Sequence, residues 1–316
     1  MDKIGLITPG CLGGCWGGEY HYFEPFVGCA HDCVYCYAKH RSDVKNKLAK
    51  RNSRFDTPSL FIEDKKELLN AIKQEVAVNN VKVLKLSRYT DIFTPPFSTN
   101  GISLEILKAL LDTQIERFII TTKGIPNSDT IDLICRNAER FSFNTVARPC
   151  TKIKFESSTV DLDVKLSVAA KIKDKGVSTT VHLDPLIPGL DDDPVVLEEY
   201  LSRLSKYGLK KIMFSYLYIH SDMLVSLSKL DGEGFSVSSL LEKYKKEPVQ
   251  LVGGQKETSY LQVKDEIKAE SIGLVSSLLN SKGFDFVICG LKNNLGNIIT
   301  KTKSNNCKVC NGSFYA

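Results

Sequence analysis

The chain has 316 residues, of which 42% are hydrophobic and 25% are charged. This balance excludes wholesale disorder and allows a large buried core. The formal net charge is +5, but no dense arginine block or basic motif interleaved with aromatic residues accompanies it, so charge alone indicates no nucleic-acid partner.

Two sequence patterns bear on where the protein works. No apolar run reaches the ~18 residues of a membrane span. The first residues, MDKIGLITPGCLGG, lack the basic and apolar regions of a signal peptide. We therefore expect a cytoplasmic protein without membrane contact, in which clustered cysteines bind metal or act in catalysis rather than form disulfides.

Short β-rich runs alternate with amphipathic helical runs between residues 81 and 219. Residues 81–87 are predicted to form a strand and residues 103–113 a helix, because leucines recur there at helical spacing. Further strands are predicted at residues 117–123, 141–147, 177–189 and 209–219, and further helices at 128–140, 161–176 and 191–208. Gly176 and Gly208 are predicted to end the last two of these helices.

This alternation predicts an α/β fold with a parallel sheet and outer helices, rolled by right-handed crossovers into an open or closed barrel. The pattern loosens after residue 219, where we predict helices near residues 237–245 and 264–281 and a strand at 284–290. We therefore expect three parts. They are an N-terminal extension with cysteines (1–22), the barrel (23–220) and a C-terminal α/β extension that ends in a C-x2-C pair (221–316).

Three of the ten cysteines stand together as Cys29, Cys33 and Cys36, in the segment GCAHDCVYCYAK. The spacing C-x3-C-x2-C lets one short loop present three thiolates to a cubane 4Fe–4S cluster. Because only three local thiolates are supplied, the fourth iron keeps an open position for a small molecule. Zinc is the alternative metal, although zinc usually takes four ligands, often in paired C-x2-C knuckles.

With the aromatic Tyr35 before its last cysteine, this motif resembles the signature of the radical S-adenosylmethionine (AdoMet, or SAM) superfamily. The resemblance implies a partial (β/α)6-type TIM barrel and an open iron that binds AdoMet. It also implies reductive cleavage of AdoMet to a 5′-deoxyadenosyl radical that abstracts hydrogen from a substrate. Tyr35 would then lie near the adenine, and a reductant such as flavodoxin or ferredoxin would be a partner.

The wider segment FEPFVGCAHDCVYCYAK resembles the spore photoproduct lyase-like branch, also described as DNA-repair-photolyase-like. Three later segments follow in the order typical of that branch: SRYTDIFTPPF with Thr90 and Asp91, IITTKG with Thr122 and Lys123, and HLDPLIPGLDDD. The similarity spans roughly residues 20 to 220. The two residues after Asp91 depart from the usual Asp-Pro-Tyr-Gln-Pro of the branch, so the group that contacts the methionine end of AdoMet stays open.

Polar residues at strand ends are the candidate cofactor contacts, because a parallel barrel places its chemistry at the carboxyl ends of its strands. They are Tyr35, Thr90, Asp91, Thr122, Lys123, Ser142, Asn144 and Arg148. Lys123 can pair with the AdoMet carboxylate; the alternative is a solvated loop lysine. Arg148 can hold an anionic group. Asp91 and Asp184 can bind ribose hydroxyls or substrate, or serve only as turn or capping residues.

The outer cysteines form a second group. Cys11 and Cys15 lie near the N-terminus, and Cys307 and Cys310 near the C-terminus. Since chain termini often lie near each other, four thiolates can close one site for a second 4Fe–4S cluster or a structural zinc; unpaired thiols without metal are the alternative. Cys150 is a candidate catalytic thiol that returns hydrogen to a product radical, or a thiol without a role.

The sequence thus favours a radical SAM enzyme that acts on a small molecule or peptide, assisted by an auxiliary cluster. The branch resemblance keeps a nucleic-acid repair or modification enzyme as the alternative, since fold analogy is a weak guide to substrate. A non-catalytic module that binds zinc or an iron–sulfur cluster is the third hypothesis. Each requires Cys29, Cys33 and Cys36 to converge.

Overall fold

A computed structural model describes residues 5–10, 20–149, 153–156, 160–232, 234–250 and 259–288. The strands are β1 (Ile7–Pro9), β2 (His21–Phe23), β3 (Phe26–Val27), β4 (Ser59–Leu60), β5 (Val83–Leu86), β6 (Arg117–Thr122), β7 (Phe141–Val146), β8 (Ser178–Leu186), β9 (Lys211–Tyr216), β10 (Val249–Gln250), β11 (Ser259–Tyr260) and β12 (Asp285–Ile288). The α-helices are α1 (Ser42–Lys50), α2 (Lys65–Val78), α3 (Ile102–Leu111), α4 (Ser128–Arg136), α5 (Leu162–Asp174), α6 (Pro194–Lys206), α7 (Leu224–Leu227), α8 (Val237–Leu241) and α9 (Asp265–Ser281). Single 3₁₀ turns are η2 (Tyr37–His40), η3 (Ala138–Arg140), η4 (Ser221–Met223) and η5 (Ser228–Leu230).

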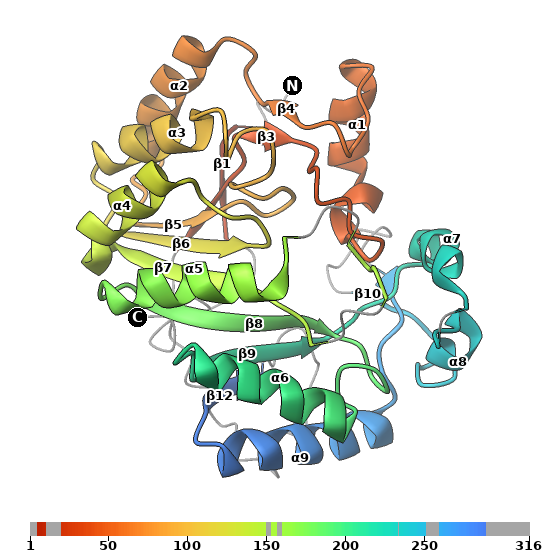
Figure 1. Ribbon diagram of the computed structural model, residues 1–316. Coiled ribbons are helices and arrows are strands. Elements are labelled where there is room, and N and C mark those ends of the chain that lie inside the picture. Colours follow the sequence, from red (N-terminus) through yellow and green to blue (C-terminus); the bar gives the residue numbers. More distant parts are fainter. Residues whose placement is uncertain are drawn as a thin grey trace.

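The central sheet has eight strands in the order β1-β2-β5-β6-β7-β8-β9-β12. β1 pairs antiparallel with β2, and every other neighbouring pair is parallel. The carboxyl ends of the parallel strands therefore share one edge, on the right in Figure 1. The predicted α/β partial barrel is confirmed: β2 and β5 to β9 are six parallel strands in sequence order, joined by crossovers.

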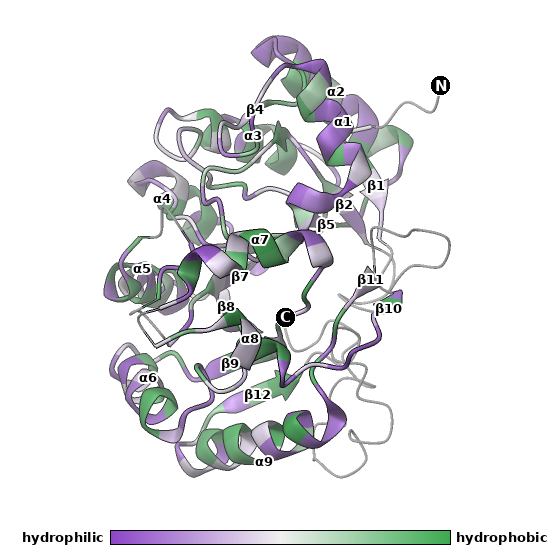
Figure 2. Ribbon diagram, turned by 90° about the vertical axis from the view of Figure 1, so that its right-hand side faces the viewer, coloured by the Kyte–Doolittle hydropathy of each residue, from purple (hydrophilic) through white to green (hydrophobic). Residues whose placement is uncertain are grey.

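Helices cover the outer side of the sheet in an arc, as Figure 2 shows for α2 to α6 and α9. The sequence of α6 explains its bounds. Asp193 caps its first turn by accepting from the N–H groups of Val195 and Val196, and Pro194 follows the cap. Gly208 ends the segment at a φ of +67°, a left-handed conformation that glycine adopts without strain.

All six residues of β7 are buried, as expected for a parallel strand covered on both faces. One continuous apolar core joins the sheet to the helices. The predicted helix near residues 237–245 is shorter than expected: α8 ends at Leu241, because Tyr244 forms a β-bridge with Val263. Among the described residues, no helix is long and apolar enough to cross a membrane.

Both segments that flank the predicted barrel contribute to the same sheet, β1 at one edge and β12 at the other. The division into three parts stays a prediction. The start of β1 is held by helix α2: the Glu75 carboxylate accepts from the backbone N–H groups of Leu6 at 3.0 Å and Ile7 at 2.9 Å. Gly5 leaves room for this contact, since a Cβ there would lie 2.5 Å from a Glu75 oxygen.

Candidate functional site

The loop that carries the three clustered cysteines, residues 29–36 (the Cys loop), follows β2 and β3 at the carboxyl edge of the sheet. Its entry depends on Gly28, which has a φ of +86° and whose Cβ would lie 2.6 Å from the carbonyl oxygen of Phe55. The N–H of Cys29 donates to that same oxygen at 2.6 Å. No other residue fits this approach without strain.

The three thiols are free, and those of Cys29 and Cys33 are buried while Cys36 is half-buried. Burial raises the pKa of the Cys29 thiol to about 12, and repulsion from Asp91 and Cys36 adds to this. Burial also raises the pKa of Cys33, which interacts with both other cysteines and with the Lys123 cation. Three interacting, buried thiols become thiolates only with nearby positive charge, and an iron–sulfur cluster supplies such charge. The site therefore fits the predicted cluster.

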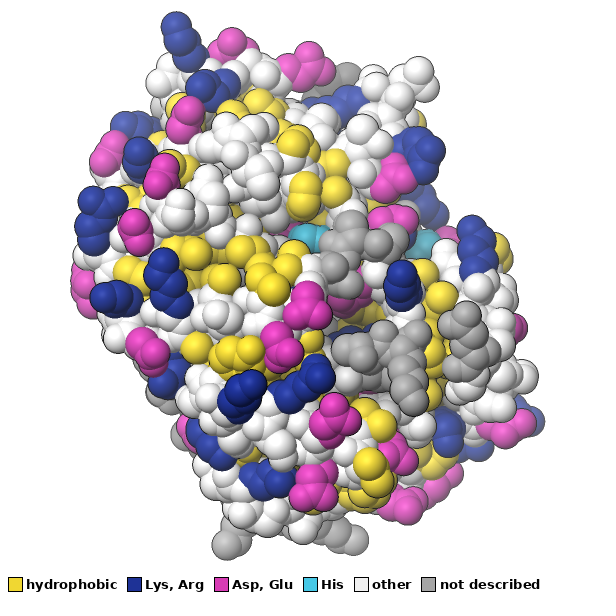
Figure 3. All heavy atoms as spheres, viewed as in Figure 1, with side chains coloured by type: hydrophobic (Ala, Val, Ile, Leu, Met, Phe, Trp, Pro, Cys, Tyr) yellow, Lys and Arg dark blue, Asp and Glu magenta, His cyan; other side chains and the backbone are white. Residues whose placement is uncertain are grey.

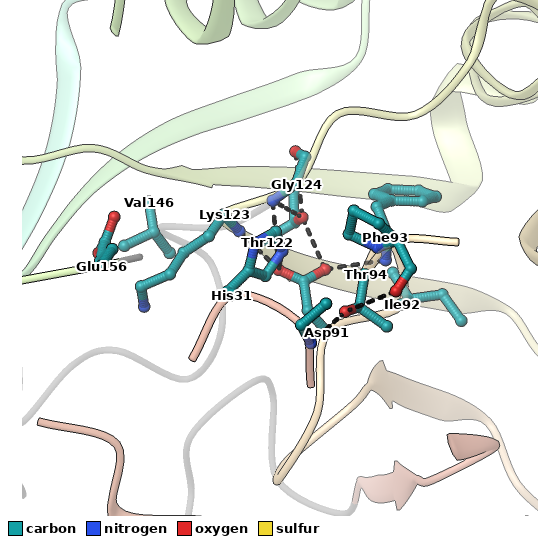
Figure 4. Close-up of polar contacts among 12 residues, drawn as sticks. His31, Asp91, Ile92, Phe93, Thr94, Thr122, Lys123, Gly124, Val146 and Glu156 are labelled. Carbon is teal, nitrogen blue, oxygen red and sulfur yellow. Dashed lines mark hydrogen bonds and ion pairs between the residues drawn. The ribbon is translucent and has the colours of Figure 1, made fainter. Parts of the chain in front are cut away.

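Asp91 connects the Cys loop to the loops after β5 and β6 (Figure 4). His31 of the Cys loop lies with its Nε2 atom 3.2 Å from the Asp91 carboxylate. The other donors to this carboxylate are Phe93 N at 2.8 Å, Thr122 Oγ1 at 2.8 Å, Lys123 N at 2.7 Å and Gly124 N at 3.3 Å. Burial acts to raise the pKa of Asp91, but His31 and the backbone donors outweigh it and hold the pKa well below its usual range.

These contacts show what two of the predicted cofactor residues do in the protein itself. The Asp91 carboxylate and the Thr122 hydroxyl bind each other, and Asp91 is buried beneath the Cys loop. They position His31 and the backbone of Lys123. A direct contact of Asp91 or Thr122 with AdoMet stays a prediction.

Glu24 is a buried carboxylate that the sequence analysis missed. It follows β2 and accepts from the backbone N–H groups of Arg88 and Tyr89 and, at 3.2 Å, from the hydroxyl of Thr90. Thr90, a predicted cofactor contact, is thus held by Glu24. The available signal was a glutamate directly after an apolar strand, in the segment HYFEPF. Acidic residues are almost never fully buried unless they are paired, so a glutamate at this position indicates a specific partner.

Burial raises the pKa of Glu24 to about 7, although the Tyr89 and Arg88 N–H groups act to lower it. The folded protein then keeps this proton at a pH where the unfolded chain has lost it, so Glu24 costs stability as pH rises from about 4.5 to about 7. Relative to wild type, the unfolding free energy of Glu24→Gln should therefore rise by about 3 kcal/mol when the pH is raised from 5 to 8. Urea unfolding at both pH values measures this.

The control is Glu105→Gln, which removes a half-exposed carboxylate that pairs with Lys65 at 2.9 Å. Surface pairs of this kind contribute about 0.2–1 kcal/mol, so its difference from wild type should change little with pH. A Glu24→Gln variant with the same pH dependence as wild type would contradict the raised pKa.

A charged group lies at the Cys loop. It consists of Tyr35, which belongs to the loop, and of Lys123 and Glu156. The Tyr35 hydroxyl donates to Glu156, and the Lys123 ammonium lies 5.5 Å from the centre of the Tyr35 ring. Burial acts to lower the pKa of Lys123, but the negative charges of Cys33 and Glu156 reverse this and raise it. Lys123 is therefore a fixed cation next to the thiols, and Figure 4 shows its side chain extending away from Asp91.

Glu156 was also missed by the sequence analysis. It lies in a segment outside any helix or strand, so no periodicity marks it. Lys165 of α5 lies 3.9 Å from Glu156. Burial acts to raise the pKa of Glu156, but the charges of Lys123 and Lys165 outweigh it and lower the pKa, so this carboxylate is ionised at neutral pH.

Arg148 is paired within the protein. Its guanidinium binds the buried Asp191 carboxylate at 2.8 and 2.9 Å from Nη2 and 3.2 Å from Nε. It also lies over the rings of Phe155, at 4.5 Å, and Tyr35, at 5.9 Å. From the sequence, Asp191 was only the first residue of the helix predicted at residues 191–208. The Arg148 guanidinium thus packs against the Tyr35 ring. A contact of Arg148 with an anionic cofactor group stays a prediction.

The two candidates on β7 differ in position. Asn144 is buried, and its amide donates to the Ile120 carbonyl at 2.8 Å, while its Oδ1 atom has no hydrogen-bond partner in the described part of the chain. Ser142 lies at the amino end of β7, where Arg117 donates to it at 3.3 Å. The structure therefore does not bring Ser142 to the edge that holds the Cys loop. Asp184 accepts from the Ser215 hydroxyl on the neighbouring strand.

Several predicted residues fall outside the described part of the chain. They are the candidate catalytic Cys150 and the outer cysteines Cys11, Cys15, Cys307 and Cys310. The second 4Fe–4S cluster or zinc that the outer cysteines would hold therefore stays a prediction.

No family model matches the sequence, and no curated protein matches it. Solved structures do resemble it. A spore photoproduct lyase variant with bound AdoMet and dinucleoside spore photoproduct superimposes with a TM-score of 0.61 at 12% identity, covering 86% of this chain and 76% of the other. Spore photoproduct lyase complexed with dinucleoside spore photoproduct gives 0.59 at 12% identity, with 85% and 75% covered. The chain shares their fold, as its motifs predicted.

Proposed function

We propose that this protein is a radical SAM enzyme. In this proposal Cys29, Cys33 and Cys36 hold a 4Fe–4S cluster, and AdoMet binds beside them to give a 5′-deoxyadenosyl radical that abstracts hydrogen from a substrate. The observation that carries it is the arrangement of three thiols, two buried and one half-buried, on one loop at the carboxyl edge of the sheet, beside the Lys123 cation. The shared fold with spore photoproduct lyase supports the same conclusion.

When bound, the cluster supplies the electron that cleaves AdoMet. The chain's own residues bind and orient the reactants. The Lys123 ammonium, next to Cys33, can donate a charge-assisted hydrogen bond to the AdoMet carboxylate. Tyr35, fixed by Glu156 and flanked by Arg148, offers an aromatic face to the adenine. Burial of this edge keeps water from a reactive radical.

For the substrate, we propose a small molecule or a peptide. On the face shown in Figure 3, acidic and basic side chains of the described residues are interspersed rather than gathered into one basic field. The dinucleoside bound by the structural neighbours favours nucleic acid as the second candidate. A DNA-binding assay at two salt concentrations separates them, since phosphate contacts weaken steeply with added salt. Salt-sensitive binding would favour the second candidate.

The decisive experiment is anaerobic purification and reconstitution of the full chain, followed by iron and sulfide analysis and incubation with dithionite and AdoMet. We expect about four irons for the Cys-loop cluster alone and about eight if the outer cysteines hold a second cluster. Formation of 5′-deoxyadenosine supports the proposal. A chain that binds metal but never cleaves AdoMet, with or without candidate substrates, would instead be a non-catalytic metal-binding module.

Lys123→Met tests how AdoMet is held. Loss of a charge-assisted hydrogen bond costs about 1.5–3 kcal/mol, so the AdoMet concentration for half-maximal 5′-deoxyadenosine formation should rise about 10- to 100-fold. The control is Lys171→Met, which removes an exposed lysine of α5. Iron content is measured in parallel, because Lys123 also faces Cys33. An unchanged AdoMet dependence with full iron content would exclude this role.

A further inference from the structure

Three metal-binding side chains meet outside the Cys loop. They are His40, the last residue of η2, and His220 and Asp222, which follow β9. One ligand atom of each lies within 4.8 Å of the others. His40 Nδ1 is 3.5 Å and His220 Nδ1 is 3.9 Å from the Asp222 carboxylate oxygens.

These distances are too long for good hydrogen bonds between the imidazoles and the carboxylate. His220 Nδ1 instead accepts from the Asp222 backbone N–H at 3.2 Å, and an ion bound by His220 would replace this contact. His40 Nε2 is buried and has no hydrogen-bond partner among the residues that the structure describes. The two imidazole rings lie parallel, with centres 5.3 Å apart and planes 9° apart. Buried polar atoms are normally paired, and a group without a partner suggests an ion or water that the protein binds.

The place of the cluster gives it a structural role. η2 follows β2, and η4 follows β9, and these are the first and last of the six parallel strands joined by crossovers. β2 and β9 do not pair with each other. The cluster therefore joins the two sides of an incomplete barrel at its carboxyl edge, between residues about 180 positions apart, next to the Cys loop.

We propose that His40, His220 and Asp222 bind one divalent metal ion of the zinc class. Two imidazoles and one carboxylate are a common protein ligand set for zinc, with the fourth tetrahedral position left to water. The ion would hold the segment after the Cys loop against the segment after β9. This site uses none of the cysteines and does not depend on the proposed AdoMet chemistry.

Lys45 of α1 competes with the ion. Its ammonium lies 3.2 Å from an Asp222 oxygen, and its side chain is 53% exposed. The ammonium can therefore move into solvent when a metal ion takes its place. Removing this charge should therefore strengthen metal binding. If Lys45 and Asp222 form only a surface ion pair, with no metal site, removing the charge should not strengthen zinc binding.

The test uses the full chain with its Cys-loop cluster reconstituted and excess metal removed. Zinc sulfate is titrated by calorimetry, and bound zinc is counted by mass spectrometry. Asp222→Asn should lose one zinc equivalent, with affinity reduced more than about 100-fold, because even an outer-shell partner is worth 10- to 100-fold. Lys45→Met should bind zinc up to about fivefold more tightly. Zinc should raise the melting temperature of wild type and of Lys45→Met, but not of Asp222→Asn.

The matched control is Asp265→Asn, which removes a carboxylate of similar exposure that pairs with Lys245 at 2.8 Å; it should keep the zinc equivalent. Cys307→Ser with Cys310→Ser distinguishes the other possible zinc site. Zinc that persists in Asp222→Asn and is lost in the cysteine variant would overturn the proposal. So would a wild-type chain that binds no more zinc than Asp222→Asn.

Discussion

Replacement of Cys33 with alanine is expected to remove the iron–sulfur cluster and to reduce 5′-deoxyadenosine formation to the background of cluster-free protein. Cys33 is the middle thiol of the Cys loop, is buried, and interacts with Cys29, Cys36 and Lys123. Two remaining thiolates cannot replace three, since each cluster iron needs its own ligand. Iron and sulfide content and 5′-deoxyadenosine formation, measured under dithionite, test this.

Cys135→Ala is the matched control, because Cys135 is a free thiol on α4, far along the chain from the Cys loop. This variant should keep both iron content and AdoMet cleavage. Equal losses in the two variants would point to general instability, and cleavage that survives in Cys33→Ala would remove the basis of the proposed function. Circular dichroism should show that Cys33→Ala stays folded, because the comparison is valid only for a folded variant.

Asp91→Ala is expected to lower the free energy of unfolding by about 3–5 kcal/mol, the cost of breaking a buried charged network by removing one partner. The buried carboxylate accepts from Thr122, from the Lys123 N–H and from His31. Without it, buried donors lose their acceptor, and three loops lose their connection. Urea unfolding at neutral pH measures the loss.

The pH dependence gives an independent check. Since the pKa of folded Asp91 lies below its usual value, its contribution is present above the unfolded value of about 3.9 and is lost as pH falls further. The difference between wild type and Asp91→Ala should therefore shrink in acid. Asp112→Ala is the control, because Asp112 is 66% exposed and pairs with Lys73 at 3.3 Å; a comparable loss there would contradict the network.

The strands and helices of the barrel were largely predictable, because each depends on local signals. The expected strand at residues 117–123 is β6 (Arg117–Thr122), and the expected helix at 161–176 is α5 (Leu162–Asp174). The sequence analysis did not predict α1 or α2. α2 nevertheless has a cap in Asp64, which accepts from Glu67 N at 2.7 Å, so its signal was available.

The partners of the site residues were not predictable, because they come from distant positions. The sequence did not indicate that the Arg148 guanidinium pairs with Asp191, 43 residues later. Glu156 reaches Tyr35 across 121 residues. Residue type and spacing place most of these side chains, though not Ser142, at the correct edge of the sheet, whereas their partners depend on the folding of loops that have no periodic pattern.

The contact between Glu75 and the start of β1 has a consequence for assembly. Among the described residues, β1 is the outermost strand on its side of the sheet, and such a strand offers open N–H groups to a second molecule. The Glu75 carboxylate accepts from the N–H of Ile7, the first residue of β1, and from that of Leu6 just before it, and brings a negative charge to the border. A neighbouring copy that added a strand at this end of β1 would have to displace that side chain, which opposes edge-to-edge pairing there.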